Sequence, residues 1–179
     1  MIITFASSKG GVGKSTSCAS LAGCYAHSGQ RVHVIDLDGN RCVSRWLADE
    51  KTRPVNLTVS APDTQILTEH LQETARHYAP DTILIDIAGS YEQALTIAIA
   101  RAHLTIIPAS TSEAEIFEAA RVARHIQTIF AAFGKIPLYR LLARRMHDSE
   151  AFSGGGNRRR ASIRRENGGT RHAVQLVWG

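Results

Sequence analysis

A glycine-rich segment with two lysines constrains this chain more than any other feature. It follows the short apolar run Ile2–Ala6 and precedes a segment with a helical pattern. Glycines let backbone N–H groups converge on an anion, and the start of the following helix adds the positive end of its dipole. We therefore predict a phosphate-binding loop made by Gly10, Gly11, Val12, Gly13, Lys14, Ser15 and Thr16.

Two side chains of this loop have expected roles. Lys14 would reach the β- and γ-phosphates of a nucleotide, and the Ser15 hydroxyl would ligate Mg²⁺. The general pattern has a glycine five residues before Gly13, where this chain has Ser8, and Lys9 adds a second lysine. The alternative is a flexible turn with lysines by chance, but the order of strand, loop and helix favours the phosphate site.

Short apolar runs alternate with longer periodic ones up to about residue 142. The short runs are rich in β-branched residues and nearly continuously apolar, which is typical of strands covered on both faces. The expected strands lie at residues 2–6, 32–35, 55–59, 82–87, 104–107 and 136–142. The expected helices lie near residues 14–27, 63–78, 91–101 and 112–133. This alternation predicts an α/β fold with a mostly parallel sheet and helices on both faces.

The expected helix at 112–133 has the clearest pattern. Thr111 or Ser112 would cap its start, Gly134 would end it, and the strand before it would close at Pro108. Apolar side chains recur at steps of three or four residues, which predicts one buried stripe. The stripe comprises Ile116, Ala120, Ala123, Ile126, Phe130 and Phe133.

Acidic residues follow two of the expected strands. Asp36 and Asp38 come at the end of the second strand, and Asp86 ends the strand that begins at Thr82. Ligands of open α/β sheets bind beyond the carboxyl ends of strands, and strand alternation would put Asp36 and Asp38 on one face. Carboxylates there hold Mg²⁺ or position a water for phosphoryl transfer. The alternative for Asp38-Gly39-Asn40 is an ordinary surface turn.

The segment Lys9-Gly10-Gly11-Val12-Gly13-Lys14-Ser15-Thr16 resembles the deviant Walker A motif of the ParA/MinD family of P-loop ATPases. The resemblance covers residues 1–142 in motif order and implies ATP and Mg²⁺ as cofactors. It implies that Lys9 acts in trans, across an ATP-dependent homodimer, and that Asp38 activates water. Asp36 and Asp86 would join Ser15 at Mg²⁺, and the Gly89 N–H would sense the γ-phosphate.

The last quarter of the chain differs in charge and texture. Residues 1–134 carry 11 basic and 13 acidic side chains, whereas residues 135–179 carry 10 and 3. Arginine clusters bind phosphate backbones without reading sequence. We expect a P-loop ATPase domain at 1–142 and a basic Gly/Arg-rich tail at 143–179. Three interpretations of this tail stay open: a disordered DNA-binding segment, a frameshift or truncation of the C-terminal part, and an unrecognised folded element.

Other features narrow the class of protein. Cys18 and Cys24 are expected to be small core residues, and Trp46 to anchor a short helix. Three cysteines without metal spacing, no signal-peptide pattern and no long apolar run predict a cytoplasmic protein without a membrane span.

The function expected from the resemblance is DNA partitioning. Such a protein hydrolyses ATP slowly, dimerises on ATP, binds nucleoid DNA non-specifically and responds to a DNA-bound adaptor protein. The alternatives are a MinD-like or conjugation-associated positioning ATPase with another cargo, a small-molecule kinase or ligase, and an incomplete nucleotide-binding remnant.

Overall fold

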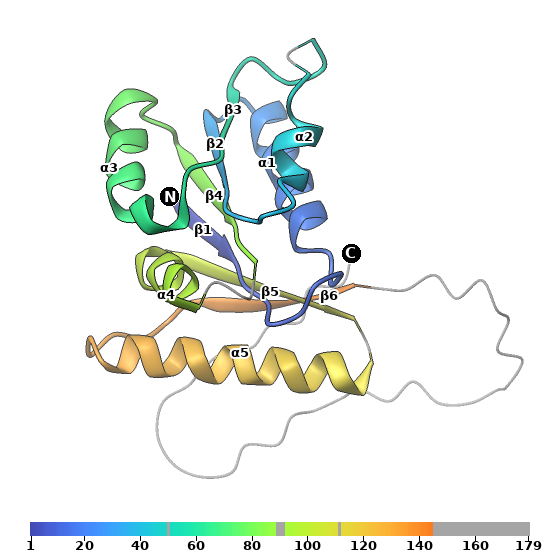
Figure 1. Ribbon diagram of the computed structural model, residues 1–179, viewed down its shortest axis with the longest axis vertical. Helices are drawn as coiled ribbons and strands as arrows, with labels where there is room; N and C mark the ends of the chain where they lie inside the picture. The colour runs from blue at the N-terminus through green and yellow to red at the C-terminus, as the bar shows by residue number, and fades with distance from the viewer. Residues whose placement is uncertain (50, 89–91, 111, 145–179) are drawn as a thin grey trace, which may run out of the picture.

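The computed structural model describes residues 1–49, 51–88, 92–110 and 112–144. Within these ranges, six parallel strands form one sheet in the order β3-β2-β4-β1-β5-β6 (Figure 1). The predicted α/β fold with a parallel sheet is confirmed. The strands are β1 (Ile2–Phe5), β2 (Val32–Asp36), β3 (Leu57–Ser60), β4 (Thr82–Asp86), β5 (Leu104–Ser110) and β6 (Tyr139–Arg144).

Helices connect the strands and cover both faces of the sheet (Figure 1). The helix predicted at 63–78 begins instead as a 3₁₀ turn, because Asp63 Oδ1 accepts from the Gln65 N–H at 2.9 Å. The helices are α1 (Lys14–His27), α2 (Cys42–Trp46), the 3₁₀ turn η1 (Thr64–Ile66), α3 (Leu67–His77), α4 (Glu92–Arg101) and α5 (Glu113–Ala131).

Strand alternation divides the core into two layers. On one face, Ile3 and Phe5 of β1 pack with Cys18 and Ala22 of α1. On the other face, β-strand side chains such as Ile85 pack with apolar residues of α3, α4 and α5. The central strands β2 and β4 are therefore buried on both sides, as their continuous apolar runs predicted, whereas the edge strands β3 and β6 are mostly half-buried.

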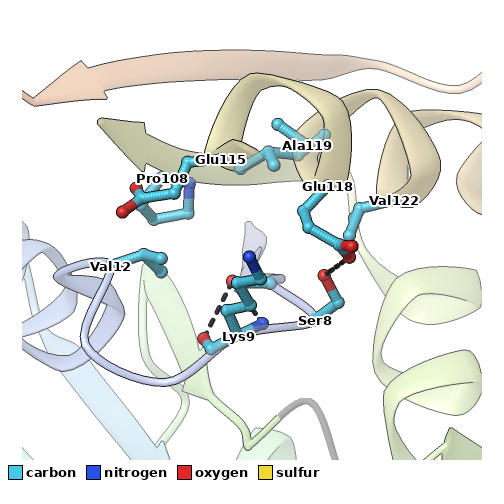
Figure 2. A pocket seen from close by; sticks show the side chains of 10 residues that line it. Ser8, Lys9, Val12, Pro108, Glu115, Glu118, Ala119 and Val122 are labelled. Atoms are coloured by element: carbon cyan, nitrogen blue, oxygen red, sulfur yellow. Dashed lines mark hydrogen bonds between the residues drawn. The ribbon is translucent and has the colours of Figure 1, made fainter. Parts of the chain in front are cut away.

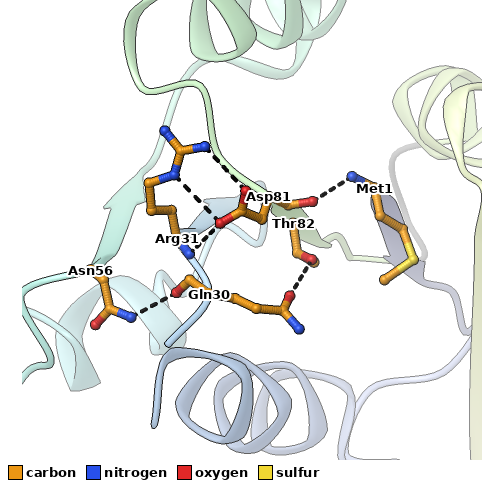
Figure 3. Close-up of polar contacts among 6 residues, drawn as sticks. All are labelled: Met1, Gln30, Arg31, Asn56, Asp81 and Thr82. Carbon is orange, nitrogen blue, oxygen red and sulfur yellow. Dashed lines mark hydrogen bonds and ion pairs between the residues drawn. The ribbon is translucent and has the colours of Figure 1, made fainter. Parts of the chain in front are cut away.

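Polar contacts fasten the amino ends of the strands (Figure 3). The Arg31 guanidinium lies 3.1 Å from the Asp81 carboxylate, and the Arg31 N–H donates to the same group at 2.8 Å. This pairing lowers the pKa of Asp81. The Met1 ammonium donates to the Asp81 carbonyl, and the Thr82 hydroxyl donates to Gln30 Oε1. These contacts therefore join the amino ends of β1, β2 and β4, opposite the carboxyl end from which the glycine-rich loop extends.

Helix α5 begins as predicted but buries a different stripe. Ser112 caps it by accepting from the Glu115 N–H at 3.3 Å. Ile116 and Phe133 of the predicted stripe are 49% and 64% exposed, and Ala120 is exposed as well, so that part of the prediction is wrong. The face that packs against the core is turned about the helix axis, so most of its buried residues lie one position before the predicted ones. The buried residues are Ala119, Val122, Ile126 and Ile129.

Strand β5 runs on through Pro108 to Ser110, so its predicted end at Pro108 is wrong. Pairing with β1 stops at Ile106, and Pro108 lies opposite Leu142 of β6. Proline has no backbone N–H to donate, and after Ile106 strand β5 no longer pairs with β1, so no hydrogen bond to β1 is lost at Pro108.

Two further core assignments need correction. Cys18 is buried, but Cys24 is exposed on α1. The short helix near Trp46 exists as α2, yet Trp46 is 54% exposed and Val43 is the buried residue that anchors it. The predicted domain division at 142 falls within β6, which runs on to Arg144, and the rest of the predicted tail, residues 145–179, lies outside the described ranges.

Candidate phosphate-binding site

The glycine-rich loop joins β1 to α1 at the carboxyl end of the sheet. Gly11 and Gly13 both adopt left-handed backbone conformations, with φ of 78° and 87°. Side chains disfavour these angles, which explains glycine at both positions. Gly13 is also the N-cap of α1, and its carbonyl accepts from the Ser17 N–H at 2.9 Å. The loop therefore delivers the chain into a helix N-terminus, the geometry that favours phosphate.

The two lysines of the loop have different surroundings. Lys14 is only 6% exposed, and its ammonium donates to the Lys9 carbonyl at 3.4 Å. Lys9 itself is exposed, and its backbone is held by Ser7, whose Oγ accepts from the Lys9 N–H and donates to the Lys9 carbonyl. A bound phosphate would give the Lys14 ammonium a charged partner in place of a single long contact with a carbonyl.

Asp86 stands out among the buried acidic residues. It is fully buried, and neither carboxylate oxygen has a hydrogen-bond partner among the described residues. Burial raises its pKa to about 6, and the charge of Asp36 adds to the rise. The nearby Ser15 hydroxyl and Lys14 ammonium act in the opposite direction, although the hydroxyl does not reach the geometry of a hydrogen bond. An unpaired buried carboxylate is costly unless a cation completes it.

The donor set around Asp86 fits Mg²⁺. Its free carboxylate oxygens lie near the Ser15 hydroxyl at the start of α1, and both are oxygen ligands of the kind Mg²⁺ prefers. The part of the chain that the structure describes has no group of three His, Cys, Asp or Glu side chains suited to a metal. That agrees with Mg²⁺ in nucleotide sites, where phosphates and water supply most ligands.

Asp36 lies beside Asp86 in the sheet register but is already engaged. Its Oδ2 accepts from the Ser44 N–H and the Ser44 hydroxyl, both at 2.8 Å, and its Oδ1 accepts from the Asp38 N–H at 3.2 Å. The Arg41 guanidinium donates to the Asp36 carbonyl. These bonds tie the turn after β2 and the start of α2 to Asp36. Its place in the Mg²⁺ shell stays a prediction.

Asp38 lies in the turn after β2, because the strand ends at Asp36. The expectation that strand alternation places both carboxylates on one face therefore does not apply. Asp38 Oδ1 accepts from the Asn40 N–H at 2.9 Å, and its charge contributes to raising the pKa of Asp86. The turn thus keeps Asp38 in electrostatic reach of the site. Gly89, predicted to sense phosphate, lies outside the described residues.

A small cavity of about 10 Å³ lies between the loop and α5. Ser8, Lys9 and Val12 contribute from the loop, and Glu115 and Glu118 from the helix (Figure 2). The Ser8 hydroxyl donates to Glu118 Oε2 at 2.6 Å. Sequence reasoning missed Ser44 and Glu118, since each reaches the site through the fold and belongs to no local motif.

Comparison with known proteins places these features in a family. The family model described as "CobQ/CobB/MinD/ParA nucleotide binding domain" matches residues 3–154. Protein virC1 of Rhizobium radiobacter is 31% identical over 128 residues, which are 70% of this chain and 55% of that protein. Protein ParA of the same organism is 32% identical over 109 residues, 60% of this chain and 47% of that protein. The chain spans about half the length of these curated relatives.

Solved structures agree on the fold. The cell division protein MinD of Aquifex aeolicus has a TM-score of 0.65 at 24% identity, covering 81% of this chain and 69% of that chain. A plasmid partition protein of Borrelia burgdorferi bound to AMPPNP also has a TM-score of 0.65, at 20% identity, covering 83% and 76%. A cobyrinic acid a,c-diamide synthase of Mycobacterium smegmatis, with bound ADP and magnesium, has a TM-score of 0.64 at 19% identity, covering 79% and 73%.

The parallel sheet, the left-handed glycines and the buried lysine define a P-loop-type nucleotide-binding fold. Since the family model covers most of the chain, the protein belongs to the CobQ/CobB/MinD/ParA nucleotide-binding family. Within the described residues, helices long and apolar enough to span a membrane are absent.

Proposed function

We propose that this protein is a ParA-type ATPase that binds ATP with Mg²⁺, dimerises on it and partitions DNA. The observation that carries the proposal is the pairing of a preformed phosphate loop with an unpartnered buried carboxylate. Lys14 offers a buried cation to phosphates. Beside them, Asp86 offers a divalent cation two oxygens that accept no hydrogen bond within the described part of the chain. The two groups together match a nucleotide with its metal better than either matches a simple anion.

Each residue has a part in the proposed hydrolysis. Backbone N–H groups of Gly10, Gly11, Val12 and Gly13 would hold the phosphates, and Lys14 would neutralise charge on the transferred group. Mg²⁺, held by Ser15 and Asp86 with Asp36 behind them, would neutralise phosphate oxygens when bound. Asp38 would orient the attacking water, and its position in a turn leaves it accessible to one.

Lys9 carries the dimer part of the proposal. Its exposure leaves the ammonium available to the phosphates of a second copy. Two nucleotides would then lie between two chains, and each Lys9 would complete the partner's site. A low intrinsic rate follows, because the catalytic charge is assembled only in the dimer.

DNA and adaptor binding belong to the same proposal. The excess of basic side chains lies in residues 135–179, and such clusters bind phosphate backbones without sequence preference. We propose a cytoplasmic, nucleoid-associated protein whose DNA grip is gated by ATP, with a DNA-bound adaptor protein stimulating hydrolysis.

Dimerisation and DNA binding test this function directly. The wild type should form dimers and bind DNA only with ATP and Mg²⁺, measured by light scattering and fluorescence anisotropy. Lys14→Ala should lose nucleotide binding, whereas Lys9→Ala should bind nucleotide and fail to dimerise. Arg76→Ala, on the exposed end of α3, is the charge-matched control and should behave as wild type. ATP-independent behaviour of all variants would reject the proposal.

A second candidate is the same ATPase with another cargo. The similarity to both virC1 and ParA, and to the MinD fold, favours a positioning ATPase of this wider kind. ATP-dependent dimers that ignore DNA would support it. A further alternative is an incomplete nucleotide-binding remnant. Weak ATP binding without dimerisation would support that alternative.

A further inference from the structure

We propose that Glu118 is a positioning residue of the phosphate loop, acting through Ser8. The Ser8 hydroxyl donates to Glu118 Oε2 at 2.6 Å, across 110 positions of the chain. A hydroxyl-to-carboxylate bond of this length is charge-assisted and stronger than a neutral pair. Figure 2 shows this bond bridging the loop and α5. The inference rests on the proposed function, because it concerns how the loop presents its lysines.

The Ser8–Glu118 bond holds the backbone next to Lys9, whose N–H and carbonyl make the contacts described below. Ser7 Oγ closes a tight turn on either side of Ser8, accepting from the Lys9 N–H at 3.1 Å and donating to the Lys9 carbonyl at 3.0 Å. The same carbonyl accepts from the Lys14 ammonium. Fixing Ser8 therefore fixes the peptide units from which Lys9 extends.

Glu118 is presented by a rigid element. Helix α5 is capped at Ser112, and the Glu115 carboxylate accepts from the Ser110 N–H at 2.6 Å, which ties the helix to β5. Ala119, next in sequence to Glu118, is buried in the core. The Glu118 side chain is 23% exposed, so the core and the loop enclose much of it.

The other charged neighbour of Glu118 is a weaker partner. Arg121 Nη1 lies 4.0 Å from Glu118 Oε2, and its side chain is 70% exposed. Exposed ion pairs of this kind contribute little. Because the general loop pattern has glycine where this chain has Ser8, the bond belongs to this chain's own residues and not to the motif.

The expected consequence falls on Lys9 more than on Lys14. Lys14 is held by the start of α1 and by burial, which the Ser8 bond does not control. Lys9 is exposed, so its position depends on the backbone at residues 7–9. Loss of the bond should weaken ATP-dependent dimerisation and lower kcat by about 5- to 10-fold, with KM for ATP changed less than about 2-fold.

A double-mutant cycle tests the coupling. Ser8→Ala and Glu118→Ala should each give this loss, and the double variant should lose no more than either one. Glu118→Gln keeps an oxygen that accepts from Ser8 and should recover most of the dimerisation. Arg121→Ala, which removes only the long ion pair, is the control and should match wild type.

Two outcomes would overturn the assignment. Losses that add in the double variant would mean that Ser8 and Glu118 act separately, and a loss in Arg121→Ala equal to that in Glu118→Ala would point to the ion pair. Exchange of the Lys9 amide, followed by NMR without nucleotide, gives an independent readout. It should speed up in Ser8→Ala and Glu118→Ala only, and unchanged exchange would refute the inference. A wild type that does not dimerise with ATP would refute the proposed function, while the exchange data would still decide about Glu118.

Discussion

Asp86 lowers the folding stability of the protein at neutral pH while providing a carboxylate at the candidate Mg²⁺ site. Its buried carboxylate lacks hydrogen-bond partners within the described chain, and its pKa rises to about 6, from a reference of 3.8, mainly through burial. In the folded protein the protonated form is therefore favoured relative to the unfolded chain. The ionised group costs folding free energy above pH 6, and this cost disappears as the pH falls from about 6 to about 4.

Asp86→Asn should therefore stabilise the nucleotide-free protein. The rise in the pKa of Asp86 from 3.8 to about 6 corresponds to about 3 kcal/mol of folding free energy at pH 7.5, where the carboxylate is ionised. Urea unfolding at pH 7.5 should show a gain of about 2–3 kcal/mol, which should vanish near pH 4. The same variant should lose Mg²⁺-dependent nucleotide binding.

Asp36→Asn is the matched control for this experiment. Asp36 accepts from the Asp38 and Ser44 N–H groups and the Ser44 hydroxyl, and an amide cannot accept at both positions. This variant should be less stable than wild type at pH 7.5. A destabilised Asp86→Asn would instead mean that the Asp86 carboxylate accepts hydrogen bonds in the folded protein.

His33 affects the stability of the wild type in the same pH range as Asp86, but in the opposite direction. It is buried against Tyr78, its ring nitrogens contact Thr58 and Ser60, and burial lowers its pKa to about 4, with a smaller contribution from the charge of His70. Because the unfolded chain binds a proton at His33 more readily than the folded protein does, the folded protein loses stability as the pH falls from about 6.5 to about 4. The two residues therefore offset each other in wild type, and Asp86→Asn should reveal the acid sensitivity.

At the scale of elements, the phosphate loop depends on backbone conformation more than on space. A Cβ atom added at Gly10 or at Gly11 would meet nothing within 4 Å. The two glycines differ in backbone angle, since only Gly11 has a left-handed φ, of 78°. Alanine at the two positions would therefore differ mainly in backbone strain, which only the left-handed φ at Gly11 would cause.

Gly11→Ala should destabilise the nucleotide-free protein by about 1 kcal/mol, because a Cβ atom strains the left-handed region. Gly10→Ala should be neutral or slightly stabilising, since it restricts the unfolded chain without strain. Thermal unfolding of both variants checks the difference. Equal losses in both would mean that crowding, and not φ, determines the cost.

Element boundaries show where local pattern stops being informative. The six strands and the cap at Ser112 were predictable, because apolar runs and capping chemistry act over a few residues. The buried face of α5 was not, since Ile116 and Phe133 are as apolar as residues that the sheet covers. Only the docking of the helix decides which of its apolar residues meet the core.

At the scale of the whole molecule, nucleotide binding should couple to global stability. A ligand that binds only the folded state stabilises it by about 2.7 kcal/mol at 100 times its Kd. We expect ATP with Mg²⁺ to raise the Tm of the wild type, and chelation of Mg²⁺ by EDTA to remove most of this gain. Lys14→Ala should show no gain in either condition. A gain that persists undiminished in EDTA would exclude a metal role for Asp86.

Sequence alone determined the fold class, the position of the glycine-rich loop and the order of the acidic residues along the chain. Those features depend on local chemistry: the periodicity of apolar residues, the conformational freedom of Gly11 and Gly13, and the end of a strand at Asp86. Only the tertiary structure decided which carboxylate is free. Parallel pairing placed Asp36 beside Asp86, and Ser44 donates hydrogen bonds to Asp36. Burial left the Asp86 carboxylate without a hydrogen-bond partner among the described residues. The Ser8–Glu118 bond arises in the same way, since packing brings α5 against the loop and no spacing in the chain encodes that contact.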